Sequence, residues 1–188
     1  MVRHWHYLLL GYLVLLSPGM WLKAQHRKMQ FDHICLKDGL PHSVVAKIIQ
    51  DKEGFLWFAT GNGLARYDGY DFTVYRPDAS DPYSIKDANI RNVVQDKAGN
   101  LWIATAFEGL NKFDRYREQF TRVNYWGKDQ GDRGRPIITS LMADTEGNVW
   151  IGTNQGLYCR TPQASKTIRY LSASGWKPST KTGREICG

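Results

Sequence analysis

The chain has 188 residues, of which 42% are hydrophobic and 13% aromatic, and its formal net charge is +7. This composition is typical of a globular protein and excludes a disordered chain. The basic residues are interleaved with Asp and Glu instead of forming a stripe, which argues against a nucleic-acid-binding surface. Eighteen Gly and seven Pro, spread through the chain, indicate many turns and therefore many short strands.

Residues 1–24 have the order of a secretory signal peptide. Arg3 comes first, an apolar run follows from 8 to 22, and Ala24 precedes Gln25. The run is shorter than the roughly 20 residues that a membrane-spanning helix needs. A buried helix or an uncleaved anchor is the alternative interpretation. We expect the chain to be exported, and no other stretch is apolar enough to span a membrane.

One pattern then occurs three times. It reads DKEGFLWFATGNGL from 51, DKAGNLWIATAFEGL from 96 and DTEGNVWIGTNQGL from 144, and its tryptophans are spaced 45 and 48 residues apart. In each copy, Asp-x-x-Gly predicts a tight turn between two strands, with Gly in the left-handed conformation. The predicted strands are 44–50, 55–60, 64–68 and 72–76 in the first unit, 89–95, 101–105, 110–114 and 120–125 in the second, and 137–143, 149–153, 157–161 and 168–171 in the third. Each unit is therefore four short antiparallel strands.

The second strand of a unit is apolar on both faces. Leu56 and Phe58 lie on one side of the strand, and Trp57 and Ala59 on the other. A strand with one face in water should alternate, so this strand is predicted to lie between stacked sheets. The repeat length suits the blades of a β-propeller, and a solenoid or a closed sandwich explains the repeated hairpins less well.

The predicted fold class is therefore all-β, a partial β-propeller of about three four-stranded antiparallel blades plus an N-terminal latch-type strand. That strand, at 30–34, resembles the fourth strands of the later units. The expected organisation is a signal peptide at 1–24, a leading segment with the outer strand of an incomplete blade at 25–40, blades at 41–78, 84–125 and 136–173, and an irregular tail at 174–188.

The repeated polar and aromatic residues favour structural roles. Asp51, Asp96 and Asp144 stand at the same place before Gly, so we interpret them as turn caps, with metal binding or acid–base chemistry as the alternative. The tryptophans at 57, 102 and 150 are predicted to pack in the core, although they could also stack on sugars. Cys35, Cys159 and Cys187 have no metal-ligand spacing, and we expect no catalytic residue, metal or cofactor.

Ligand contact is expected from loops that do not repeat. The longest polar connections are 69–85 and 124–136. Tyr125, Trp126 and Arg135 are the candidates, because two aromatic rings and a guanidinium could stack on and hydrogen-bond an oligosaccharide. A solvated connection between blades is the alternative.

The pattern D-x-x-G-x-L-W-[IF]-[AG]-T-x-x-G-L, with Val149 in place of Leu in the last copy, resembles the regulator-propeller repeats of hybrid two-component sensors. These are envelope-spanning histidine kinases common in gut Bacteroidetes. The resemblance implies a periplasmic sensor that detects carbohydrate fragments and regulates polysaccharide-utilisation genes, within a parent protein in the inner membrane.

Kinase motifs are missing from these 188 residues. None of the five His is followed by an acidic residue in the manner of a phosphoacceptor, and the glycines belong to hairpin turns. We therefore expect no enzymatic activity on this chain and interpret it as the N-terminal fragment of a longer sensor. A part of a propeller glycosidase or lyase, or a structural scaffold, is the alternative. Expected partners are an oligosaccharide and either the remaining blades or a second copy at the open blade faces, and no nucleic acid.

Overall fold

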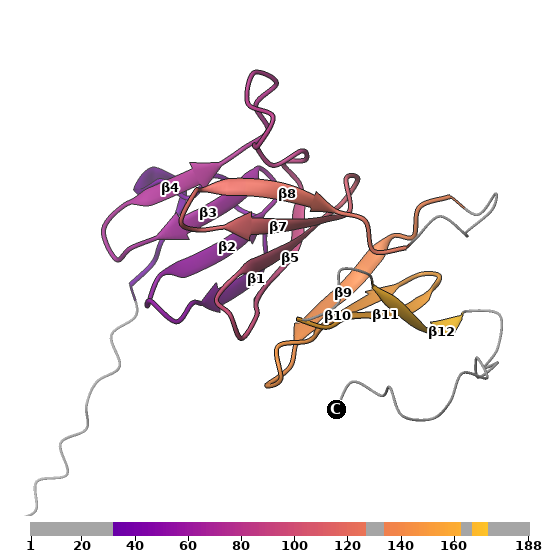
Figure 1. Cartoon of the computed structure of the whole chain (residues 1–188). Coiled ribbons are helices and arrows are strands. Elements are labelled where there is room, and N and C mark those ends of the chain that lie inside the picture. Colours follow the sequence, from indigo (N-terminus) through magenta and orange to yellow (C-terminus); the bar gives the residue numbers. More distant parts are fainter. Residues whose placement is uncertain (1–31, 127–133, 163–166, 173–188) are drawn as a thin grey trace, which may run out of the picture. The chain divides into compact units, whose positions relative to one another are not determined.

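The computed structural model describes residues 32–126, 134–162 and 167–172 (Figure 1). The chain divides into two compact units, 1–33 and 34–188, and the strands lie in the second. The predicted signal peptide at 1–24 and the predicted tail at 174–188 lie outside the described residues. Within the described ranges, no helix is long and apolar enough to cross a bilayer.

In the described part of the chain, twelve strands form three four-stranded antiparallel sheets, each in chain order. The first sheet contains β1 (Val45–Gln50), β2 (Leu56–Thr60), β3 (Gly63–Tyr67) and β4 (Phe72–Tyr75). The second contains β5 (Ile90–Gln95), β6 (Leu101–Thr105), β7 (Leu110–Asp114) and β8 (Gln119–Val123), and the third contains β9 (Ile138–Ala143), β10 (Val149–Thr153), β11 (Gly156–Arg160) and β12 (Ile168–Ser172). The prediction of an all-β chain built from four-stranded units is confirmed.

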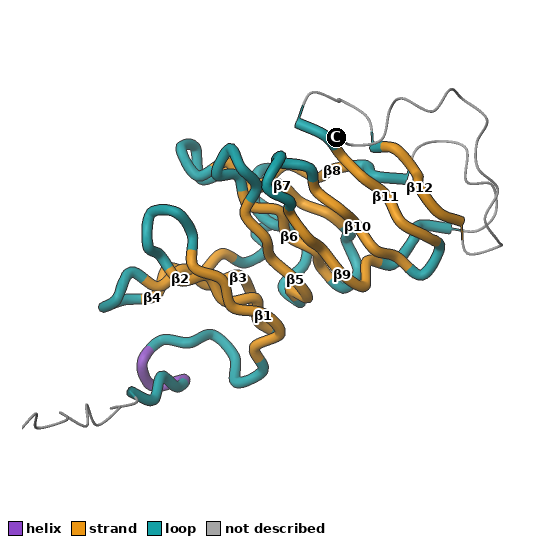
Figure 2. Tube along the Cα trace, turned by 90° about the horizontal axis from the view of Figure 1, so that it is seen from below, coloured by secondary structure: helices purple, strands orange, loops and turns teal. Residues whose placement is uncertain are grey.

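The first strands of the three sheets, β1, β5 and β9, lie side by side (Figure 2). This is the arrangement of propeller blades, whose innermost strands surround a common axis. The second strands are enclosed as predicted: every residue of β6 is buried, and so are four of the five residues of β2. The fold class is therefore that of a partial β-propeller.

Two apolar clusters join the sheets. Side chains of the first sheet, Trp57 and Leu64 among them, pack against Val93, Ile103 and Phe113 of the second. Trp102 and Leu110 of the second sheet pack in the same way against Leu141 and Ile151 of the third, together with Tyr125 and Tyr158. The repeated tryptophan thus points toward the following sheet in both cases, and its predicted core role is confirmed for Trp57 and Trp102.

The outer face of the first sheet has no preceding sheet among the described residues. Phe58 and Ala65 are covered there by Leu40 and Ile34, next to the short 3₁₀ helix η1 (Leu36–Asp38). Ile48 remains 52% exposed, whereas its equivalents Val93 and Leu141 are 0% and 8% exposed. This face therefore retains apolar surface that an adjoining sheet covers in the second and third units.

The latch-type strand predicted at 30–34 falls at the edge of the described chain. Residues 30 and 31 lie outside the described residues, and residues 32–34 are not in a strand. Ile34 instead packs on the outer face of the first sheet.

Candidate functional site

The acidic residue of each repeat holds a turn and a tryptophan together. One oxygen of Asp51 accepts hydrogen bonds from the backbone N–H of Glu53 (3.0 Å) and of Phe55 (2.9 Å). The other oxygen accepts from Trp57 Nε1 at 2.7 Å. The interpretation of these carboxylates as turn caps is confirmed, and the bond to the indole six residues later is an addition that sequence reasoning missed.

The same bond occurs in the other two repeats. Trp102 Nε1 donates to Asp96 and Trp150 Nε1 donates to Asp144, both at 2.9 Å. Burial acts to raise the pKa of Asp144, but hydrogen bonds from Trp150 and Asn148 outweigh it and hold this pKa below its usual value. Since each carboxylate is occupied by donors of its own repeat, these residues are structural. In the described part of the chain, no three His, Cys, Asp or Glu side chains gather as a metal site would require.

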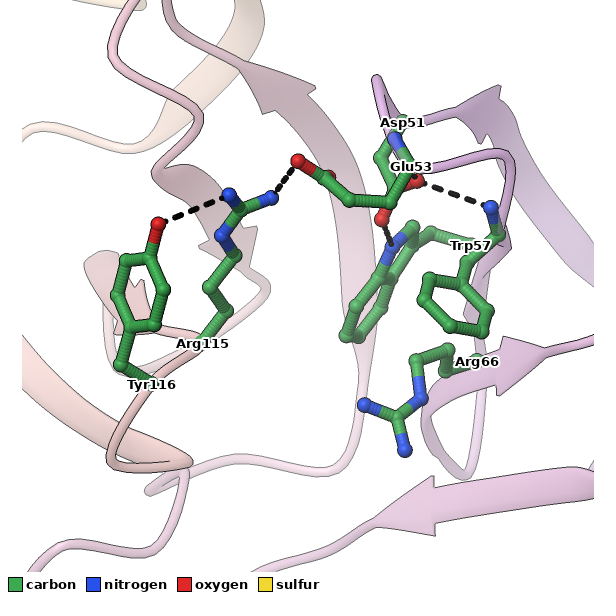
Figure 3. A pocket seen from close by; sticks show the side chains of 7 residues that line it. Asp51, Glu53, Trp57, Arg66, Arg115 and Tyr116 are labelled. Carbon is green, nitrogen blue, oxygen red and sulfur yellow. Dashed lines mark hydrogen bonds and ion pairs between the residues drawn. The ribbon is translucent and has the colours of Figure 1, made fainter.

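A groove of about 280 Å³ lies between the first two sheets, beside the first Asp–Trp pair (Figure 3). Arg115 forms an ion pair with Glu53 and donates to the Tyr116 hydroxyl at 3.1 Å. Its hydrogen bond is the main reason why the pKa of Glu53 lies below its usual value. The lining side chains are Asp51, Glu53, Phe55, Trp57, Arg66, Arg115 and Tyr116.

The second cation of this groove is also engaged. The guanidinium of Arg66 lies 5.2 Å from the centre of the Phe55 ring, a cation–π distance, and 3.2 Å from Glu118. Glu118 also accepts from the hydroxyl of Tyr75, whose pKa burial raises to about 12. The groove therefore presents aromatic surface between two ion pairs that connect the first and second sheets.

An equivalent groove of about 150 Å³ lies between the second and third sheets. There Lys112 and Arg160 lie 5.7 and 5.6 Å from the Trp102 ring. Lys112 takes the position of Arg66, and Asp96 that of Asp51. Because the groove recurs with the repeat, it is a consequence of stacking two units.

A third cavity has a volume of about 430 Å³. It lies where the connection from β4 to β5 meets β7 and β8, and its lining residues are Pro82, Ser84, Lys86, Glu108, Asn111, Phe120 and Arg122. Part of the predicted ligand-contacting connection 69–85 thus borders a cavity. Sequence reasoning missed Lys86 and Asn111. The available signal was that Asn111 takes the position of Ala65 and Tyr158, so it is the polar exception in the repeat.

The predicted ligand residues lie near one another, toward the third sheet. Tyr125 is 1% exposed, packs edge-on to Trp126 with ring centres 5.0 Å apart, and donates from its hydroxyl to the Pro136 carbonyl. Burial raises its pKa to about 12. Arg135 lies 3.6 Å from Glu108, which also borders the third cavity. Residues 127–133 lie outside the described residues, and a ligand role for these three side chains stays a prediction.

The cysteines provide no chemistry that the described residues reveal. Cys159 is buried in the third sheet and Cys35 is partly exposed beside η1, while Cys187 lies outside the described residues.

Comparison with known proteins supports the repeat assignment. The model of the two-component regulator propeller family matches residues 39–62, 84–107 and 133–155, one segment in each unit. Histidine kinase P4 of Formosa agariphila is 44% identical over 64 residues, which are 34% of this chain and 5% of that protein.

Two solved structures from B. thetaiotaomicron share the fold. One is the extracellular domain of a protein assigned as a hybrid two-component system, with a TM-score of 0.64, 27% identity and coverage of 74% of this chain and 20% of that one. The other is the extracellular domain of a protein assigned as a one-component system, with a TM-score of 0.52, 26% identity and coverage of 68% and 18%.

The stacked four-stranded sheets, with their Asp–Trp pairs and neighbouring first strands, define the class of β-propeller repeat proteins. Within that class, a segment of each unit matches the two-component regulator propeller family, and the fold is shared with the extracellular domain of a two-component system. The predicted resemblance is therefore confirmed. The chain spans about 5% of the curated kinase and about a fifth of the structurally similar chains.

Proposed function

We propose that this chain is part of the periplasmic ligand-binding propeller of a hybrid two-component histidine kinase that senses carbohydrate and regulates polysaccharide-utilisation genes. The observation that carries the proposal is the match of all three stacked units to the regulator propeller family. The structural relatives are extracellular domains, which supports an exported location. The role assigned to these residues is recognition, while phosphoryl transfer belongs to a kinase module elsewhere in the parent protein.

Binding to oligosaccharides tests this function. The full chain is applied to an array of plant and host glycans, and bound glycans are then incubated with it and separated by chromatography. We expect binding to one chemical class of glycan without any new product. Product formation would favour the propeller glycosidase or lyase alternative, and an array without binding would favour a structural scaffold.

The open faces of the outer sheets are proposed contact surfaces. Ile48 and Met142, which lie on the first and third sheets, are 52% and 57% exposed. Since apolar burial contributes about 25 cal/mol per Å², covering such a face stabilises the fold substantially. We therefore propose that further blades of the parent protein, or a second copy of this chain, cover these faces. Sedimentation velocity of the isolated chain checks this, and a concentration-independent monomer would contradict it.

A further inference from the structure

The cavity between the β4–β5 connection and the second sheet contains a buried polar group without a protein partner. Asn111 is 1% exposed, and its Nδ2 has no hydrogen-bond partner. The equivalent residues, Ala65 and Tyr158, are not amides, so the repeat does not require Asn at this position. Less than 1 Å² of this nitrogen is exposed, so a bound molecule reaches it only once the Asn111 side chain turns toward the cavity. A buried donor left without a partner costs about 1–3 kcal/mol, and this cost favours that rotation when an acceptor is bound.

The charges around Asn111 favour an anionic ligand. Arg122 is the cross-strand neighbour of Asn111, so both side chains extend from the same face of the second sheet. Lys86 Nζ donates to the Asp81 carbonyl at 3.1 Å and to the Ser84 hydroxyl at 3.4 Å, both of them neutral oxygens. Glu108 is held by Arg122 at 3.0 Å and by Arg135 at 3.6 Å. Among the residues that line the cavity, two cations, Lys86 and Arg122, therefore accompany one carboxylate, Glu108.

The walls are preformed. Ser84 Oγ lies 2.8 Å from the carbonyls of Asp78 and Asp81, and the backbone N–H of Phe120 donates to the Tyr83 carbonyl at 2.8 Å. These bonds fix the connection against β8 before any ligand arrives. The volume of about 430 Å³ lies within the range of roughly 300–1,000 Å³ that small-molecule sites occupy.

We propose that this cavity binds an acidic sugar, in which a carboxylate or sulfate accepts from Lys86, Arg122 and the Asn111 amide. The sugar part rests on the proposed sensing function. The carboxylate or sulfate supplies the acceptor that Asn111 lacks, and the ring hydroxyls face Glu108. Asn111 departs from the residues at the equivalent positions of the repeat, and Lys86 lies in the connection between two units, as expected for a specific site on a repeated scaffold.

Titration of the isotope-labelled full chain with four probes tests the proposal. The probes are glucuronate, glucose 6-sulfate, neutral glucose and inorganic sulfate, followed by NMR shifts of the side-chain amide of Asn111. We expect the two acidic sugars to bind, at least tenfold more tightly than glucose or sulfate, and to bind more weakly as the salt concentration rises. Asn111→Ala and Lys86→Met should each weaken binding of the better probe about tenfold, as expected for a charge-assisted hydrogen bond.

Lys112→Met is the matched control, because Lys112 follows Asn111 on β7 and points to the opposite face of the sheet. It should change the affinity less than twofold. Equal affinity for glucose would overturn the anionic class, equal affinity for inorganic sulfate would overturn the sugar, and equal effects of Lys86→Met and Lys112→Met would overturn the location. If none of the probes binds while the glycan array reports neutral glycans, this site is refuted and the sensing function stands. If the acidic sugars bind here but the glycan array shows no binding, the site stands and the proposed sensing function is refuted.

Discussion

Substituting Asp96 by Asn tests whether the repeated carboxylate stabilises the blades. One oxygen of Asp96 accepts from the backbone N–H of Asn100 at 2.9 Å, and the other accepts from Trp102 Nε1 at 2.9 Å. Asp96 is 8% exposed and Trp102 is 5% exposed, so water cannot readily replace either oxygen. In the variant, an NH₂ group replaces one of the two carboxylate oxygens. It would face either the indole N–H or the backbone N–H, and that donor would lose its acceptor.

The expected cost follows from the bonds that are lost. A hydrogen bond to a charged group contributes about 1.5–3 kcal/mol, and a buried indole N–H without an acceptor costs a comparable amount. Allowing for overlap between these two terms, we expect Asp96→Asn to lower the free energy of unfolding by about 3 kcal/mol. For a chain of this size, that corresponds to a fall in melting temperature of about 6–12 °C.

Guanidinium unfolding of the full chain, followed by circular dichroism, measures this loss. Asp144→Asn is the internal control: Trp150 is only partly buried, so water can satisfy its N–H and the loss should be about 1 kcal/mol. In a double-mutant cycle, Trp102→Phe should remove most of the effect of Asp96→Asn. Equal losses at 96 and 144, or no coupling between Asp96 and Trp102, would refute the assigned role of the carboxylate.

Three further predictions concern the faces, the charges and the turns. Ile48→Asp should reduce self-association in sedimentation runs and leave the fold intact. Val93→Asp, at the equivalent but fully buried position, should abolish the circular dichroism signal of the folded chain. Equal damage from both substitutions would contradict the assignment of an open face to the first sheet. The lowered pKa of Asp144 contributes stability that is complete above about pH 5 and is lost as the pH falls through the folded-state pKa, which lies below 3.8. Asp144→Asn should therefore make the free energy of unfolding fall less steeply with pH on the acid side. An unchanged acid-side slope would argue against this contribution of Asp144. Gly63→Ala should cost about 2 kcal/mol or more in thermal unfolding, because φ of Gly63 is +115° and the added Cβ would lie 2.7 Å from a carbonyl oxygen on the next strand. Gly54→Ala should cost about 1 kcal/mol, because φ of Gly54 is +96° but the space around it is open. Similar costs at both glycines would show that the close contact at Gly63 is relieved.

The strands could be predicted because the repeat presents each signal three times. A single run such as LWFAT is ambiguous between a buried strand and part of a helix. Three copies after Asp-x-x-Gly turns remove that ambiguity, since the same turn chemistry recurs at Gly54, Gly99 and Gly147, all of which adopt positive φ. The burial of Trp57 and Trp102 follows from the same comparison, because stacked sheets enclose the second strand on both faces.

The cavity beside Asn111 could not be predicted in this way. Its walls come from β7, from β8 and from the connection 76–89, and only the folded chain shows that Lys86 and Arg122 line one cavity. Periodicity places Asn111 on the face toward the first sheet, but it does not reveal whether a neighbour satisfies the amide. The Asp–Trp bonds were missed for a related reason, since a spacing of six residues across a turn has no regular secondary-structure meaning.

The equivalent positions of the three units separate architecture from specificity. Where the repeat keeps a residue, as at Asp51 and Trp57, the structure shows the same contacts in every sheet, and these contacts are satisfied within the protein. Where the repeat changes a buried residue from apolar to polar, as at Asn111, the new group has to find a partner that the scaffold does not provide. A propeller built from near-identical blades can acquire a distinct ligand through such exceptions and through the connections between its blades. A buried position at which one repeat has a polar residue and the others do not is therefore a stronger indication of a binding site than the repeated aromatic positions.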